Sequence, residues 1–93
     1  MNFFFTAKAI DADNVVVANH TNDLSSLPFD IPDDDQIAGR FRLPGGMAGE
    51  RIEHILAERA KPTALEHSDA TILLRLSEDG EIAYWVIPKT EKC

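Results

Sequence analysis

The sequence predicts an α+β fold, in which a small antiparallel sheet of four or five strands carries one helix on one face, in the order β-β-(β)-α-β-β. Two pairs of strand-like segments, each joined by a short turn-forming stretch, predict two hairpins. Between them lies one segment whose apolar residues recur at helical spacing. The 93 residues fit one domain, 1–93, and leave no room for a second core.

The first hairpin is expected from two segments rich in strand-favouring residues, 2–10 and 15–19, which are joined by turn formers at 11–14. Side chains alternate along a strand, so the first strand has one apolar face, formed by Phe3, Phe5, Ala7 and Ala9. Its other face is mixed and carries Phe4, Thr6, Lys8 and Ile10.

Residues 20–36 are expected to form a long surface loop, because they contain two prolines, many turn formers and no sustained period. Loops of this length without structure of their own are often functional or disordered. Four apolar side chains are expected to pin the loop to the body: Leu24, Leu27, Phe29 and Ile31. The aspartates of the loop are expected to remain in solvent.

The third strand of the predicted order, given in parentheses above, is expected over 37–43. Gly39 weakens the strand pattern of this segment. Residues 44–46 then break the chain before a helix over 47–60, whose apolar stripe is Ala48, Ile52, Ile55, Leu56 and Ala60. We expect this helix to end by Lys61, because Pro62 lacks an N–H and disfavours helical geometry in the residue before it. Arg59 and Lys61 would then suit its negative C-terminal end.

The second hairpin is expected over 70–77 and 81–88, with 78–80 as its turn. A turn with Gly80 in a left-handed bulge position makes Leu76 oppose Ile82, Leu74 oppose Tyr84 and Ile72 oppose Val86. One face is then wholly apolar. The opposite face is mixed, so Leu73, Trp85 and Ile87 lie either under another segment or in an exposed patch, and a homodimer through that face or an unpaired strand edge stays open.

The net charge of −7 disfavours direct binding to DNA or RNA phosphates. Residues 1–39 hold seven acidic residues against one lysine, a net charge of −6, so nearly all the excess lies there. It is concentrated in the stretch Asp30 to Asp35. The excess negative charge is therefore confined largely to one part of the chain.

Other features give expectations about compartment and cofactors. Lys8 and Asp11 interrupt the apolar start before it reaches the length of an export signal, and no stretch is long enough to span a membrane, so we expect a cytoplasmic protein. The one cysteine, Cys93, forms neither an intramolecular disulfide nor a multi-cysteine zinc site, and its role stays open. We expect no cofactor.

Catalytic and metal patterns are weak. Glu50, His54 and Glu58 follow one another at four-residue steps and share a helix ridge that could hold a divalent metal, but such spacing is also the ordinary pattern of a solvated helix. The serines and histidines match no nucleophile motif. We therefore expect no metal and no enzymatic activity, with a metal-dependent enzyme as the third hypothesis after the two below.

The preferred hypothesis is a non-enzymatic interaction protein whose acidic segment docks on a basic protein surface, such as that of a nucleic-acid-binding protein. Its contact residues would be Asp23, Phe29, Asp30, Asp33, Asp34 and Asp35. In size and charge alone, the chain is similar to immunity proteins and to anti-defence (anti-CRISPR-like) inhibitors that cover a nucleic-acid groove. The competing interpretation is that the aspartates only keep the loop soluble.

The alternative function is a regulatory domain that binds a small anionic ligand. Arg40 and Arg42 supply positive charge, and Gly45 and Gly46 offer free amides before the helix. The glycines fit neither the P-loop nor the dinucleotide pattern, and chain reversal into the helix explains them equally well.

Overall fold

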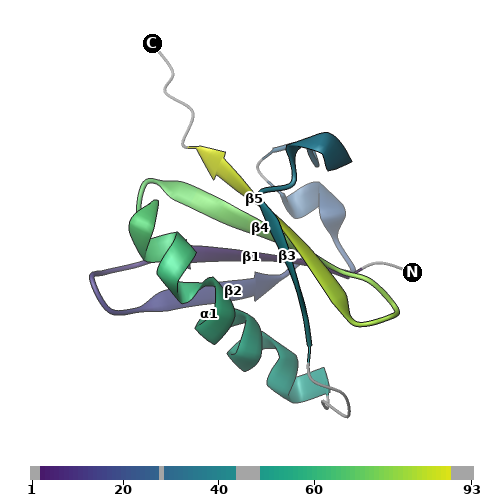
Figure 1. Cartoon of the computed structure of the whole chain (residues 1–93), viewed down its shortest axis with the longest axis horizontal. Helices are drawn as coiled ribbons and strands as arrows, with labels where there is room; N and C mark the ends of the chain where they lie inside the picture. Colours follow the sequence, from purple (N-terminus) through teal and green to yellow (C-terminus); the bar gives the residue numbers. More distant parts are fainter. Residues whose placement is uncertain (1–2, 28, 44–48, 89–93) are drawn as a thin grey trace.

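The computed structural model describes residues 3–27, 29–43 and 49–88 as a five-stranded antiparallel sheet with one helix packed on it (Figure 1). The strands are β1 (Phe3–Ala9), β2 (Val15–Asn19), β3 (Gly39–Arg42), β4 (Ala70–Leu76) and β5 (Glu81–Pro88), and the helix is α1 (Gly49–Glu66). Their order across the sheet is β2-β1-β4-β5-β3. The α+β class, with one helix on one face of the sheet, is confirmed.

The β4–β5 hairpin has the register that its apolar alternation predicts. Leu76 pairs with Ile82, Leu74 with Tyr84 and Ile72 with Val86. Gly80 has a φ of +88°, a left-handed geometry that costs residues with a Cβ about 1–2 kcal/mol. Its amide donates to the Ser77 carbonyl (3.0 Å), which closes the turn.

The turn of the β1–β2 hairpin is stabilised by side chains, as the turn-forming residues predict. The Asn14 amide donates to both carboxylate oxygens of Asp11 (3.0 and 2.9 Å), and the Asp13 amide donates to one of them (2.8 Å). The hydrogen bonds from Asn14 and then Asp13 lower the pKa of Asp11, because they favour its charged form.

The strand of 37–43 exists, and Gly39 has a packing reason to be there. β3 pairs with β5, so that Gly39 lies opposite Tyr84 and Phe41 opposite Ile82. A Cβ at position 39 would lie 2.5 Å from the Tyr84 hydroxyl oxygen, which means that the tyrosine ring occupies the space a side chain would need. Glycine therefore allows an aromatic side chain of β5 to cover the edge strand.

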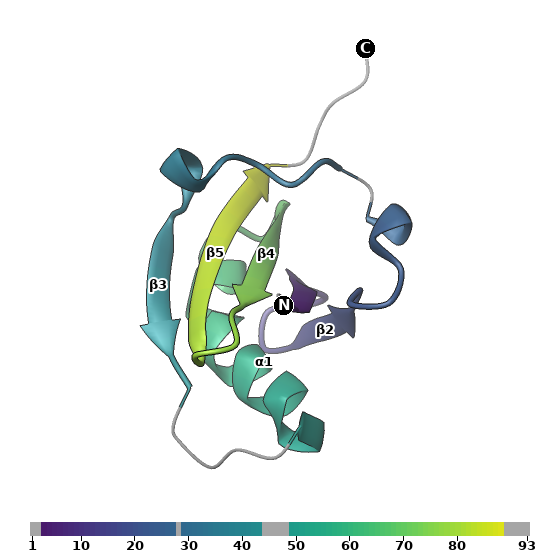
Figure 2. The ribbon, with the colours of Figure 1, turned by 90° about the vertical axis from the view of Figure 1, so that its right-hand side faces the viewer.

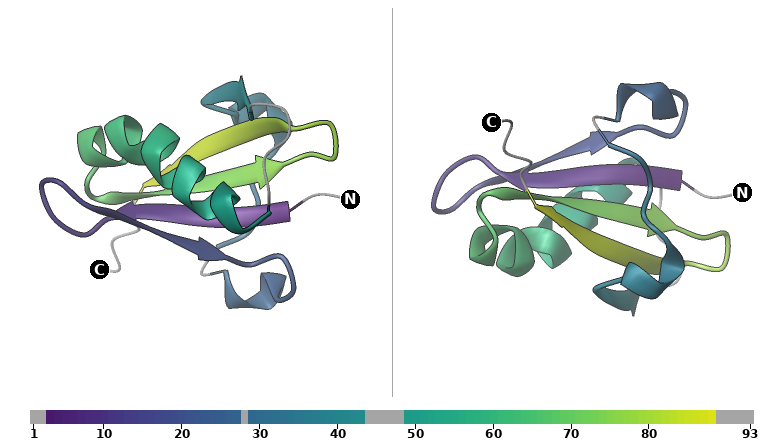
Figure 3. Two further views of the ribbon diagram at one scale, coloured as in Figure 1. Left: turned by 90° about the horizontal axis from the view of Figure 1, so that it is seen from below. Right: turned by 90° about the horizontal axis from the view of Figure 1, so that it is seen from above.

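The main core lies between α1 and one face of the sheet (Figure 3, left). It is formed by Phe5, Ala7, Leu56, Ala60, Ala64, Ile72, Leu74, Leu76 and Ile82. Ile52 of the expected helical stripe packs against it, whereas Ala48 falls outside the described residues. The helix lies against β2, β1 and β4, so it covers this side of the sheet off-centre.

The expected end of the helix at Lys61 is wrong, because α1 continues through Pro62 to Glu66. Proline removes one backbone hydrogen bond and strains the preceding turn, at a cost of about 3 kcal/mol. The extra turn buries Ala64 completely, four residues after Ala60 on the same stripe. Tertiary burial therefore outweighs a local rule, and the expected terminal cations are absent from the last turn.

Candidate protein-binding surface

The segment between β2 and β3 crosses the face of the sheet that α1 leaves open (Figure 2; Figure 3, right). It contains two short 3-10 helices, η1 (Leu24–Ser26) and η2 (Asp34–Gln36). We call residues 20–38, without the undescribed Pro28, the acidic strap. The sheet is thus covered by a helix on one face and by an irregular acidic segment on the other.

The acidic strap covers a second, smaller apolar cluster. Its buried members are Phe4, Leu73 and Trp85, and the residues packed against them are Leu27, Phe29, Ile37 and Ile87. Of the two alternatives for the mixed face of the second hairpin, Trp85 lies under another segment and not in an exposed patch. It is 1% exposed, so it cannot form a dimer contact. Leu27 and Phe29 anchor the strap as expected, but Leu24 and Ile31 do not, since they are 44% and 38% exposed.

The first half of the strap is held by a half-buried histidine. Nδ1 of His20 is hydrogen-bonded to the Ser26 hydroxyl (2.8 Å), which also lies 2.8 Å from the Asp23 carbonyl oxygen. Nε2 of His20 is hydrogen-bonded to the Thr6 hydroxyl on β1 (2.9 Å). His20 is therefore a structural bridge between η1 and β1.

The second half of the strap is held by Trp85 and Arg75. Nε1 of Trp85 donates to the Asp33 carbonyl (3.0 Å), and Nη1 of Arg75 donates to the Asp34 carboxylate (2.9 Å). The Arg75 guanidinium also lies 5.2 Å from the centre of the Trp85 ring, within the range of a cation–π contact. One tryptophan thus supports both the backbone of η2 and the cation that pairs with it.

The expected contact residues divide into two groups. The carboxylates of Asp23 and Asp34 are engaged within the chain, by the Ser25 hydroxyl and by Arg75, and Phe29 packs inward. The carboxylates of Asp30, Asp33 and Asp35 have no hydrogen bond or ion pair with any described residue. All five aspartates are exposed.

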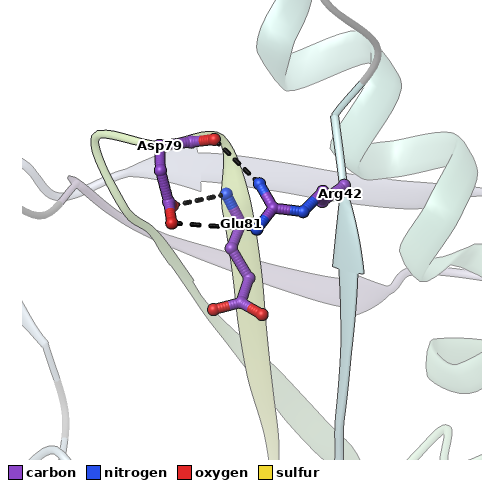
Figure 4. Close-up of polar contacts among 3 residues, drawn as sticks. All are labelled: Arg42, Asp79 and Glu81. Carbon is purple, nitrogen blue, oxygen red and sulfur yellow. Dashed lines mark hydrogen bonds and ion pairs between the residues drawn. The ribbon is translucent and has the colours of Figure 1, made fainter.

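The expected anion site is not assembled by the described residues. Nη1 of Arg42 donates to the Asp79 carbonyl (3.0 Å), and Nη2 lies 3.8 Å from the Asp79 carboxylate, which also accepts from the Glu81 amide (Figure 4). Arg42 thus supports the β4–β5 turn. Arg40 is exposed, and Gly45 and Gly46 lie outside the described residues.

The helix ridge considered for a metal gives one contact, in which Nε2 of His54 lies 3.2 Å from the Glu58 carboxylate. The side chain of Glu50 is outside the described part of the chain. Within that part, no group of three or more His, Cys, Asp or Glu side chains is placed to hold a metal ion.

Sequence reasoning missed three residues that position the acidic strap: His20, Arg75 and Trp85. Their partners lie between 6 and 52 positions away along the chain, so no local spacing links them. The one signal in the sequence is the mixed face of the second hairpin, where a tryptophan and an arginine occupy positions that need a cover.

None of the helices in the described ranges combines the length and the apolar character needed to cross a bilayer. No protein-family model matches the chain, and comparisons with curated proteins and with solved structures find no match.

Proposed function

We propose that this chain is a non-enzymatic interaction protein that docks the acidic strap onto a basic surface of another protein. This proposal rests on a difference between two sets of groups in the strap. Phe29, the Asp33 carbonyl and the Asp34 carboxylate are engaged by side chains of the sheet. The carboxylates of Asp30, Asp33 and Asp35 have no described partner. A loop kept only for solubility needs no such anchoring.

Anchoring matters because ordering a loop on binding costs about 0.5–1.5 kcal/mol for each side chain immobilised. A strap already fixed by His20, Arg75 and Trp85 avoids much of that cost. Its unpaired carboxylates then form a fixed negative field that steers a basic partner and accelerates its association.

The charge distribution indicates the chemistry of the partner. Residues 1–39 carry −6 of the total −7, and phosphate backbones repel such a surface. A protein that itself holds nucleic acid presents the complementary basic groove. An inhibitor of the immunity or anti-defence type, which covers such a groove, fits these charges.

The test begins with co-purification of the tagged chain from its native host and identification of bound proteins by mass spectrometry. Association with a basic partner is then measured by surface plasmon resonance at several salt concentrations. The triple variant Asp30→Asn, Asp33→Asn, Asp35→Asn should lower the on-rate at low salt by about tenfold or more and flatten its salt dependence, because the steering charges are gone.

The matched control is Asp34→Asn, which removes one charge that Arg75 already partly neutralises. It should change the on-rate much less than Asp35→Asn does. Phe29→Ala should weaken binding at every salt concentration, because it loosens the strap without altering its charge. If a basic partner binds the triple Asn variant as fast as it binds the wild type, the aspartates serve only to keep the loop soluble.

A further inference from the structure

A second candidate binding site lies on the other face of the sheet. Because α1 packs against β2, β1 and β4, the helix side of β5 and β3 is left partly open, and a cavity of about 220 Å³ lies there. Its apolar lining comes from the core residues Ala60, Ile72 and Leu74 and from the aromatic rings of Phe41 and Tyr84. Arg59 and Thr63, on neighbouring turns of α1, border it as well.

Three polar groups at this cavity have no polar partner among the described residues. The Tyr84 and Thr63 hydroxyls have no side-chain hydrogen bond with any described residue, and the Arg59 guanidinium has no ion pair with one. That guanidinium lies over the Phe41 ring, whose centre is 6.0 Å away. Two cationic residues, Arg40 and Arg59, and two hydroxyl groups therefore border an apolar space.

An apolar cavity bordered by a cation favours a ligand with an apolar body and one negative charge. A cavity of about 150 Å³ is large enough to bind benzene, so the larger space here can accept a ring with a carboxylate attached. The guanidinium fork of arginine matches a carboxylate through two parallel hydrogen bonds. The paired rings of Phe41 and Tyr84, with centres 6.2 Å apart and planes tilted by 46°, offer an aromatic wall for the body of such a ligand.

We propose that this cavity binds a small aromatic carboxylate, with Arg59 holding the charge and the Tyr84 and Thr63 hydroxyls completing its coordination. The excess negative charge of the chain does not oppose this binding, because most of it lies on the acidic strap across the sheet. The proposal is independent of the docking function, since it uses other residues on the opposite face.

Arg40 also borders the cavity, so the matched control is a cation elsewhere on the chain. Lys61 is exposed on α1 and is not among the residues that line this cavity. It follows Arg59 by two residues, which places the two side chains about 200° apart around the helix. Substituting Lys61 removes the same charge as substituting Arg59 and should leave the cavity intact.

The experiment is a titration of the ¹⁵N-labelled chain with sodium benzoate, followed by amide chemical shifts. Benzamide, which has the same shape and no charge, serves as the neutral probe. Benzoate should give saturable shifts centred on Phe41, Thr63 and Tyr84, with a Kd of about 1 mM, as expected for so small a ligand. Benzamide should bind at least about tenfold more weakly, because it cannot form the charge-assisted pair.

Arg59→Gln should weaken benzoate binding by about tenfold and leave benzamide binding unchanged, while Lys61→Gln should change neither. Arg59→Lys keeps the charge without the fork and should give an intermediate Kd. Arg59 is exposed, so its variants should retain the wild-type amide spectrum. The proposal is overturned if benzoate gives no saturable shifts at these residues, if benzamide binds equally well, or if Lys61→Gln weakens binding as much as Arg59→Gln.

Discussion

The two faces of the sheet are covered by different means. On one face, α1 buries a regular stripe that includes Leu56, Ala60 and Ala64. On the other, the acidic strap buries a smaller cluster and depends on polar contacts made by His20 and Arg75. The helix satisfies its own backbone hydrogen bonds, whereas the strap must find partners on the sheet.

Because of this difference, we expect substitutions under the helix and substitutions under the acidic strap to affect stability in different ways. A helix held by a close-packed stripe leaves a cavity when a core side chain is shortened, because its backbone cannot collapse locally. An irregular segment can shift to fill space, but it loses stability when a polar anchor is removed, since a buried donor is left without a partner.

The largest expected effect is at Leu74, and its neighbour Leu73 provides the comparison. The two leucines are 1% and 0% exposed and lie under the helix and the strap respectively. Leu74→Ala should reduce the free energy of unfolding by about 4 kcal/mol, and Leu73→Ala by about 2 kcal/mol, because the strap can partly collapse onto the shortened side chain. Equal losses in urea denaturation would mean that both covers are equally rigid.

The next effect concerns two aromatic residues of β5 that carry polar groups. Trp85→Phe removes the hydrogen bond to the Asp33 carbonyl and part of a buried ring, so it should cost about 2 kcal/mol. Tyr84→Phe removes a hydroxyl with no described partner and should be nearly neutral. Thermal unfolding followed by circular dichroism measures both, and a Tyr84→Phe loss as large as that of Trp85→Phe contradicts the distinction between the faces.

A smaller effect is expected at the His20 bridge. His20→Phe breaks its contacts with Thr6 and Ser26 and should destabilise the first half of the strap by about 1–2 kcal/mol. Thr6→Val removes one of these contacts with little change of shape and should cost about half as much. Hydrogen exchange should show the loss at the amides of Ser26 and Leu27, and uniform protection across the variants would mean that the bridge does not hold η1.

The smallest effect separates two neighbouring aspartates of η2. Asp34 pairs with Arg75, whose side chain is 20% exposed, while the Asp35 carboxylate has no described partner. Asp34→Asn should cost about 0.5 kcal/mol at low salt and less at high salt, because Asp34 itself is 71% exposed and screened by solvent. Asp35→Asn should be neutral or slightly stabilising, as measured by the urea midpoint.

Local patterns predicted the parts of the fold whose partners are close in sequence. The register of the second hairpin follows from alternating apolar residues and from Gly80, and both are confirmed. The helix follows from its apolar stripe. The candidate contact surface was predicted as an acidic stretch with four apolar anchors, of which only Leu27 and Phe29 pack as expected. An irregular segment has no regular period, so the direction of each side chain cannot be inferred from its spacing.

By itself, the sequence determined the α+β class, the two hairpins and the uneven charge, since each depends on neighbouring residues or on composition. The tertiary structure alone decided that the helix passes through Pro62, that Gly39 accepts the ring of Tyr84, and that Asp34 pairs inward with Arg75. Each depends on a contact between segments distant in the chain, where burial or pairing outweighs the local preference.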